Sequence, residues 1–172
     1  MKAKTNTLRL EEATPEDVPA LTETWFAAFA DDAVIRRLWP DTPSVRAWWD
    51  TANRGDMWEK PFQRFIKVVD TSTGDIKAAT DGRGGKAGRP RIAAWAKWDT
   101  NLDTLVTHPD YQRRGAASML LRWGCELADE NGVGAYVDAS KAGALLYERF
   151  GFVDESVDRD GEVASMARRR RS

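Results

Sequence analysis

The sequence predicts one α/β (α+β) domain with about seven strands and about four helices. Short apolar or alternating runs typical of strands recur along the chain, and longer segments carry apolar residues at helical spacing. The expected order is β, α, α, β, β, β, α, β, α, β, β. A chain of 172 residues has the length of one ordinary domain and can bury a full core, so we expect residues 1–172 to form a single domain.

The chain is expected to begin with a strand and two helices. The run LRLEEA, residues 8–13, reads as a strand, and Thr14 and Pro15 are suited to the N-cap and first position of the helix that follows. A second helix around PSVRAWWDTAN contains Trp48 and Trp49, for which we favour the core over a cleft wall. One face of the first helix presents Val18, Leu21, Trp25, Ala28 and Phe29.

Two further strands, RFIKVVD and RIAAWAKWD, flank a segment rich in Gly, Lys and Arg. We expect a mobile loop at about residues 71–90. Its positive charge could contact a phosphate-bearing ligand, but a solvated loop is the simpler reading.

The second half is expected to continue with a strand, LDTLVTHP, and a long helix. A short strand, AYVDAS, a helix, KAGALLYERF, that ends at Gly151, and two strands joined through Asp160 and Gly161 come next. The closing RRRRS, residues 168–172, reads as a solvated basic tail, with a nuclear-localisation signal as the alternative. The apolar stripe of the long helix consists of Ala117, Leu120, Leu121, Gly124, Leu127 and Ala128.

Composition limits the function classes. A formal net charge of −1 gives no global field for nucleic acid or an anionic membrane, so we expect a small-molecule or peptide partner. The single cysteine, Cys125, and the single histidine, His108, make no metal-ligand cluster, and we expect no metal. Cys125 borders an apolar stripe and reads as a packed thiol, and His108 reads as structural. With no signal peptide or membrane span in view, a reducing, cytoplasmic location is expected.

The segment from His108 to Gly132 predicts an anion site. A helix N-terminus leaves backbone N–H groups without intrahelical partners and carries about half a positive charge. The residues from Gly115 to Ser118 are all small, so a bulky anion could approach the backbone, and Arg113 and Arg114 add positive charge. A phosphate is the expected guest. The alternative is an ordinary helix start with solvated arginines.

The motif and its surroundings resemble a known family. QRRGAA, residues 112–117, follows LVTHPDY and precedes ALLYERFGF. From Leu102 to Phe152 the chain thereby resembles the GNAT superfamily of acyl-CoA-dependent N-acetyltransferases, whose signature is Gln or Arg, two variable residues, Gly, one variable residue, then Gly or Ala. The resemblance implies a mixed, mostly antiparallel central sheet splayed between the fourth and fifth strands.

The resemblance also implies acetyl-CoA as cosubstrate and assigns residues to it. The backbone edge of the fourth strand would pair with pantetheine, and Ser140 stands where many relatives carry an Asn that contacts CoA. Tyr147 matches the usual general acid, which would protonate the departing thiolate; a core tyrosine beside Phe150 and Phe152 is the alternative. The implied CoA-binding residues are Leu105, Val106, Thr107, Gln112, Arg113, Arg114, Gly115, Ala116, Ala117, Ser118 and Ser140.

Direct attack by a neutral amine is the chemistry that the resemblance implies. Because a lysine-like amine has a pKa of about 10.4, a base or water chain must take its proton. Asp103 and Asp138 are the candidates, although each could be a solvated carboxylate. Asp31, Asp32 and Trp39 could bind a cationic acceptor, or they could form an ordinary polar connection with one anchor.

The leading function hypothesis is therefore an N-acetyltransferase that acts on a small-molecule or peptide amine, as a monomer or homodimer. The alternative is a non-catalytic GNAT-fold module that senses acyl-CoA. A P-loop is disfavoured because no GK[ST] follows the glycine.

Overall fold

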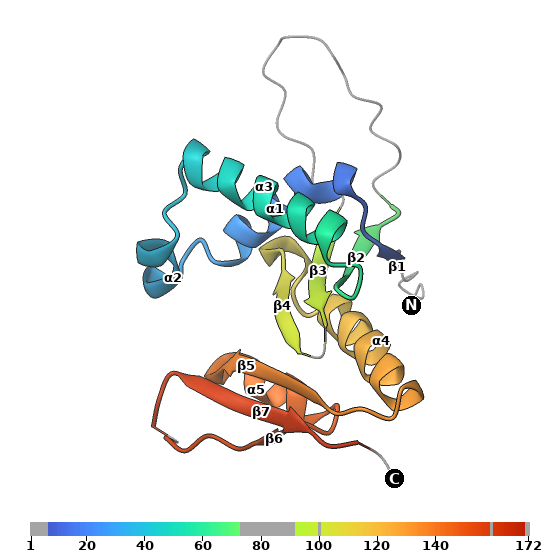
Figure 1. Ribbon diagram of the computed structural model, residues 1–172. Helices are drawn as coiled ribbons and strands as arrows, with labels where there is room; N and C mark the ends of the chain where they lie inside the picture. The colour runs from blue at the N-terminus through green and yellow to red at the C-terminus, as the bar shows by residue number, and fades with distance from the viewer. Residues whose placement is uncertain (1–6, 73–91, 100, 159, 171–172) are drawn as a thin grey trace, which may run out of the picture.

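A computed structural model describes residues 7–72, 92–99, 101–158 and 160–170, in which seven strands and five α-helices are present (Figure 1). Most of the predicted loop at about residues 71–90 lies outside this described part. The elements are β1 (Leu8–Glu12), α1 (Val18–Ala28), α2 (Ala33–Leu38), α3 (Pro43–Glu59), β2 (Arg64–Asp70), β3 (Ile92–Trp98), β4 (Leu102–Thr107), α4 (Ala116–Glu130), β5 (Ala135–Ser140), α5 (Lys141–Glu148), β6 (Val153–Asp154) and β7 (Val163–Arg168).

The strands form two antiparallel sheets that meet at one point. The first has the order β1-β2-β3-β4 and the second the order β5-β7-β6. In the described residues, a single parallel bridge between Asn101 and Tyr136 joins β4 and β5. The mixed, mostly antiparallel class and the splay between the fourth and fifth strands are therefore confirmed.

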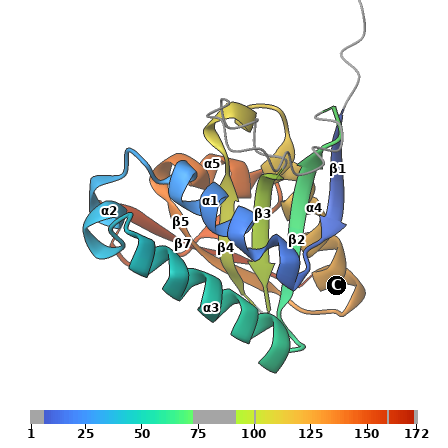
Figure 2. The same cartoon turned by 90° about the horizontal axis from the view of Figure 1, so that it is seen from above.

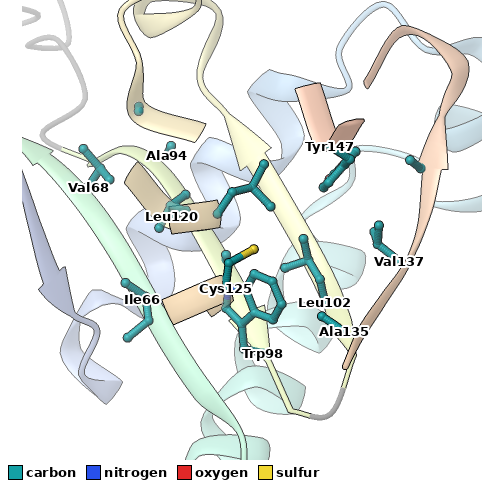
Figure 3. Close-up of a cluster of buried hydrophobic side chains, with 14 of the residues drawn as sticks. Ile66, Val68, Ala94, Trp98, Leu102, Leu120, Cys125, Ala135, Val137 and Tyr147 are labelled. Atoms are coloured by element: carbon teal, nitrogen blue, oxygen red, sulfur yellow. The ribbon is translucent and has the colours of Figure 1, made fainter. Parts of the chain in front are cut away.

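Helices cover both faces of the first sheet. Figure 2 shows α1 and α3 in front of β2, β3 and β4, with α4 behind them. On the α1 side, the buried Trp95 donates its indole N–H to the carbonyl of Leu21, 2.9 Å away. On the α4 side, Leu120 and Cys125 pack against residues of β2 and β5, so one apolar cluster ties the two sheets together (Figure 3).

The connection after α1 contains a helix that the sequence pattern did not predict. Asp32 accepts a hydrogen bond from the backbone N–H of Ile35, at 2.9 Å, and so caps the six-residue α2. Val34 and Leu38 on this helix are 55% and 62% exposed and Ile35 alone packs against the core, so six residues give too short an apolar pattern to predict a helix.

The two tryptophans of α3 have different surroundings. Trp49 is half-buried, with its ring centroid 4.5 Å from that of Trp25. Trp48 is 53% exposed and stacks on Trp39, so the expectation of a core position fails for Trp48.

The prediction of a solvated tail is wrong at Arg168. This residue ends β7, is 4% exposed, and forms two hydrogen bonds with Asp129 of α4 at 2.8 and 2.7 Å. Its Nε also donates to the carbonyl of Phe150. A buried cation is tolerated because a carboxylate and a carbonyl replace its water.

Candidate functional site

The start of α4 offers unpartnered backbone donors. Gly115 is the N-cap residue, with φ at 90°, and in the described residues no side chain caps this helix. Arg113, two residues earlier, also has positive φ, at 62°. A Cβ built on Gly115 would meet no atom within 4 Å, so the space in front of the helix is open. The N–H groups of the first turn can therefore bind an anion.

A pocket of about 700 Å³ lies in front of this helix start. It joins the end of β4, the turn before α4, the first turn of α4, and residues of α1 and α5. The pocket brings together every predicted CoA-binding residue except Arg114 and Ser140. The predicted residues that line it are Leu105, Val106, Thr107, Gln112, Arg113, Gly115, Ala116, Ala117 and Ser118.

The edge of β4 faces this pocket. β4 pairs with β3 on one side, and its bridge to β5 lies at Asn101, before the strand begins, so its described residues have no ladder partner along the second edge. A register shift leaves Asp103 without a backbone ladder partner in β3, which marks a bulge near the start of the strand. An extended amide ligand could add to the free edge at Leu105–Thr107.

Arg114 does not line the pocket, contrary to the expectation that both arginines flank the anion. Its Nη2 lies 3.0 Å from Oδ2 of Asp70, the last residue of β2. The guanidinium also lies 4.7 Å from the ring centre of Tyr111. The buried carboxylate and the aromatic face hold the side chain away from the pocket, and Arg113 is the arginine that lines it.

Tyr147 is a buried residue of α5. It is 7% exposed, makes an edge-on contact with Phe152 at 5.7 Å between ring centroids, and is not among the residues that line the pocket. Figure 3 shows it among the apolar side chains that join α5 to the rest of the core. Burial raises the pKa of Tyr147 to about 12, so its hydroxyl keeps its proton at neutral pH.

Ser140 begins α5. Its hydroxyl accepts a hydrogen bond from the N–H of Gly143 at 3.2 Å and thereby caps the helix. Ser140 is not among the residues that line the pocket, although Gly143 is. Serine is a preferred N-cap residue, so a sequence signal for this role was present.

The two candidate bases lie outside the pocket. The Asp103 carboxylate, 51% exposed, is 3.2 Å from Nζ of Lys97. Oδ1 of Asp138 accepts hydrogen bonds from the hydroxyls of Tyr136, at 2.6 Å, and Ser165, at 3.0 Å. In the described residues, Asp138 thus accepts hydrogen bonds from two hydroxyls, whereas Asp103 already has a cationic partner.

Other candidate residues have structural partners. Nδ1 of His108 accepts from the N–H of Asp110 at 3.2 Å and caps the turn that leads into α4. Cys125 is buried in the core. Asp32 caps α2, and Asp31 is exposed.

Sequence reasoning missed the walls that distant elements supply. Leu145 and Leu146 of α5 also line the pocket, together with Phe29 and Arg149, the residues that follow α1 and α5. The helical pattern of ALLYERF was visible, but nothing in it showed that an exposed leucine would face the start of α4. A smaller apolar pocket, about 400 Å³, lies at the C-terminal half of α4 and contains no predicted site residue. No helix in the described ranges is both long and apolar enough to cross a membrane.

Comparisons with known proteins agree with this geometry. A family model described as an acetyltransferase (GNAT) domain matches residues 77–154, which include β4, the start of α4 and α5. The probable acyltransferase SID5 of Ajellomyces capsulatus is 30% identical over 64 residues, which are 35% of this chain and 46% of that protein. The match thus spans less than half of the curated relative. Both descriptions are of acyltransferases.

Solved structures show the same fold. One of Corynebacterium glutamicum, described as histone acetyltransferase HPA2 and related acetyltransferase, has a TM-score of 0.67 at 21% identity, with 96% of this chain and 98% of that chain covered. The PaiA N-acetyltransferase of Thermoplasma acidophilum, in complex with coenzyme A, has a TM-score of 0.64 at 14% identity, with 94% and 98% covered. The GNAT domain model thus matches a part of the chain that includes the start of α4, and these solved acetyltransferases share the fold of the chain.

Proposed function

We propose that this protein transfers an acetyl group from acetyl-CoA to a primary amine by direct attack on the thioester. The observation that carries the proposal is that one pocket is lined both by an uncapped helix N-terminus and by the open edge of a strand. A phosphate needs the first feature, and the amide-containing pantetheine arm needs the second.

The lining residues fit CoA. The pyrophosphate would bind the backbone N–H groups between Arg113 and Ser118, where the open space at Gly115 leaves room for it. The pantetheine amides would pair with the edge of β4 at Leu105–Thr107. A backbone N–H of this edge would also stabilise the charge that develops on the thioester oxygen during attack.

The amine must lose a proton, and a carboxylate is the group that we expect to accept it. We propose Asp138 as the group that binds the ammonium form or accepts its proton, since its contacts are hydroxyls. Asp103 is the second candidate, and its contact with Lys97 opposes a cationic acceptor there. Replacing Asp138 with Asn should lower kcat/KM for the amine, with CoA affinity unchanged. Equal kcat/KM in a folded Asp138→Asn variant would remove this role.

One observation favours the alternative, a module that binds acyl-CoA without turnover. Tyr147, the proposed general acid, is buried and outside the pocket lining. If the hydroxyl does not reach the sulfur when CoA is bound, acyl-CoA could be held without efficient transfer.

The test is acetyl-CoA-dependent thiol release with a panel of small amines, peptides with a free N-terminus, and lysine-containing peptides. An enzyme releases free CoA faster when one class of amine is added, and mass spectrometry finds that amine acetylated. Calorimetric binding of CoA with no acceleration by any amine would instead support the sensor. Failure to bind CoA would reject both proposals.

A further inference from the structure

The side chain of Arg114 leaves the pocket and ties its rim to the first sheet. Nη2 of Arg114 is 3.0 Å from Oδ2 of Asp70 and 3.3 Å from Oγ1 of Thr7. The guanidinium also covers the ring of Tyr111, which is 1% exposed and lines the pocket. Arg114 therefore contacts the end of β2, the segment before β1, and the turn that precedes α4.

Asp70 is a buried and hydrogen-bonded partner of Arg114. It is 3% exposed, and its Oδ1 also accepts from the N–H and hydroxyl of Ser72 at 3.0 and 2.7 Å. Burial alone would raise the pKa of Asp70, but hydrogen bonds from Thr7, Ser72 and Arg114 outweigh it and hold the pKa well below its ordinary value. Asp70 is thus charged at neutral pH, and a buried carboxylate of this kind requires its partners.

The backbone on both sides of Arg114 has an unfavourable conformation that side-chain contacts must hold in place. Arg114 lies between Arg113, with φ at 62°, and Gly115, with φ at 90°. Left-handed backbone is unfavourable for a residue with a Cβ, so the conformation of Arg113 persists only where its surroundings fix it. Between these two left-handed residues, the side chain of Arg114 contacts the buried carboxylate of Asp70 and the ring of Tyr111.

We propose that Arg114, through its contact with Asp70, is a positioning residue that holds the turn before α4 so that its backbone N–H groups converge on the CoA pyrophosphate. This inference rests on the proposed CoA site. Arg114 fixes the position of the backbone N–H groups. Arg113 lines the pocket, and its positive charge attracts the phosphates.

The experiment compares Arg114→Ala with Arg113→Ala and with Arg169→Ala. Arg169 is an exposed arginine paired with Glu155, so its variant controls for loss of an ion pair away from the pocket. CoA dissociation constants are measured by calorimetry at several salt concentrations. KM and kcat are measured with acetyl-CoA and with S-acetylpantetheine, which lacks the phosphates.

Arg114→Ala should weaken CoA binding about 10- to 100-fold, as expected when a donation to a charged phosphate is misaligned. KM for acetyl-CoA should rise with little change in kcat, and S-acetylpantetheine should be used as before. The salt dependence of CoA binding should stay near that of the wild type, because Asp70 already neutralises this arginine. Arg113→Ala should reduce the salt dependence, and Arg169→Ala should change nothing.

Arg114→Lys keeps a cation near Asp70 but lacks the planar group that covers Tyr111, so it should fold and show an intermediate loss. Unchanged CoA affinity in both Arg114 variants, beside a wild type that binds CoA, would overturn this inference alone. An equal loss with S-acetylpantetheine would also overturn it, because the effect would then not concern the phosphates. A wild type that does not bind CoA would overturn the proposed function as well.

Discussion

Replacing Tyr147 with Phe separates a catalytic hydroxyl from a packing residue. The variant keeps the ring that contacts Phe152 in the core and deletes only the hydroxyl. The side chain is 7% exposed, and burial alone accounts for its raised pKa, with no contribution from a hydrogen bond. Removal of the hydroxyl should therefore change the free energy of unfolding at pH 7 only a little.

The expected loss of turnover follows from the pKa of the hydroxyl. An ordinary thiol has a pKa of about 8.5, whereas burial raises the pKa of Tyr147 to about 12. Full proton transfer from Tyr147 to the thiolate would then be uphill by about 5 kcal/mol. If Tyr147 is the general acid, its hydroxyl acts mainly by donating a hydrogen bond to the sulfur, and kcat of the Phe variant should fall by about 10²-fold, the lower end of the usual range for acid–base groups.

Rates of thiol release between pH 7 and 10 test this reasoning. Since Tyr147 does not titrate until about pH 12, the ratio of wild-type to variant kcat should stay constant across this interval. A wild-type rate in the variant would show that the hydroxyl has no catalytic role. A ratio that collapses near pH 9 would show that Tyr147 titrates there, and the account of its burial would be wrong.

The same burial predicts a difference in alkaline stability. A pKa that is higher in the folded than in the unfolded state gives stability that is complete below the unfolded value, about 10, and is lost as the pH rises toward 12. The total is about 3 kcal/mol. Denaturant unfolding from pH 8 to 12 should show this loss in the wild type and a smaller loss in Tyr147→Phe. Identical profiles would contradict it.

Two further predictions concern the packing that supports the site. A Cβ at Gly124 of α4 would lie 2.3 Å from ring atoms of the buried Trp98, so Gly124→Ala should lower the free energy of unfolding by about 1–3 kcal/mol despite the better helix propensity of alanine; equal or higher stability would refute this. Arg168→Ala removes two hydrogen bonds to Asp129 and should cost about 2 kcal/mol, whereas the exposed Arg169→Ala should cost close to nothing; equal costs in denaturant titrations would mean that the burial of Arg168 is irrelevant.

The predicted strands that agree best with the structure are those with a strong local pattern. β2 has an apolar run and β5 an alternating one, and both occupy the predicted residues, Arg64–Asp70 and Ala135–Ser140. The helix α2 is too short for such a pattern: two of its apolar residues, Val34 and Leu38, are exposed, Ile35 packs against the core, and Asp32 caps its start. β6 is only two residues long, although FVDESV suggested a longer strand.

The site residues likewise fall into those that a local sequence motif predicts and those that only the tertiary fold brings together. Residues of one contiguous motif, Gln112–Ser118, could be placed at the pocket, Arg114 excepted, because the phosphate-binding features of a helix start are local in sequence. The partner of Arg114 could not be predicted, since Asp70 is 44 residues away and only the tertiary fold brings them together. The burial of Tyr147 likewise depends on packing among several elements.

The central claim is that the start of α4 binds the CoA pyrophosphate, and a calorimetric titration of CoA into two matched glycine variants tests it most directly. Gly115 and Gly132 lie at opposite ends of α4, both have positive φ, and a Cβ on either would meet no atom within 4 Å. Valine should therefore strain the backbone at both positions by about 1–2 kcal/mol, but only Gly115 lines the pocket. The account predicts that folded Gly115→Val loses CoA affinity while Gly132→Val binds as the wild type does; wild-type affinity in both variants would contradict it.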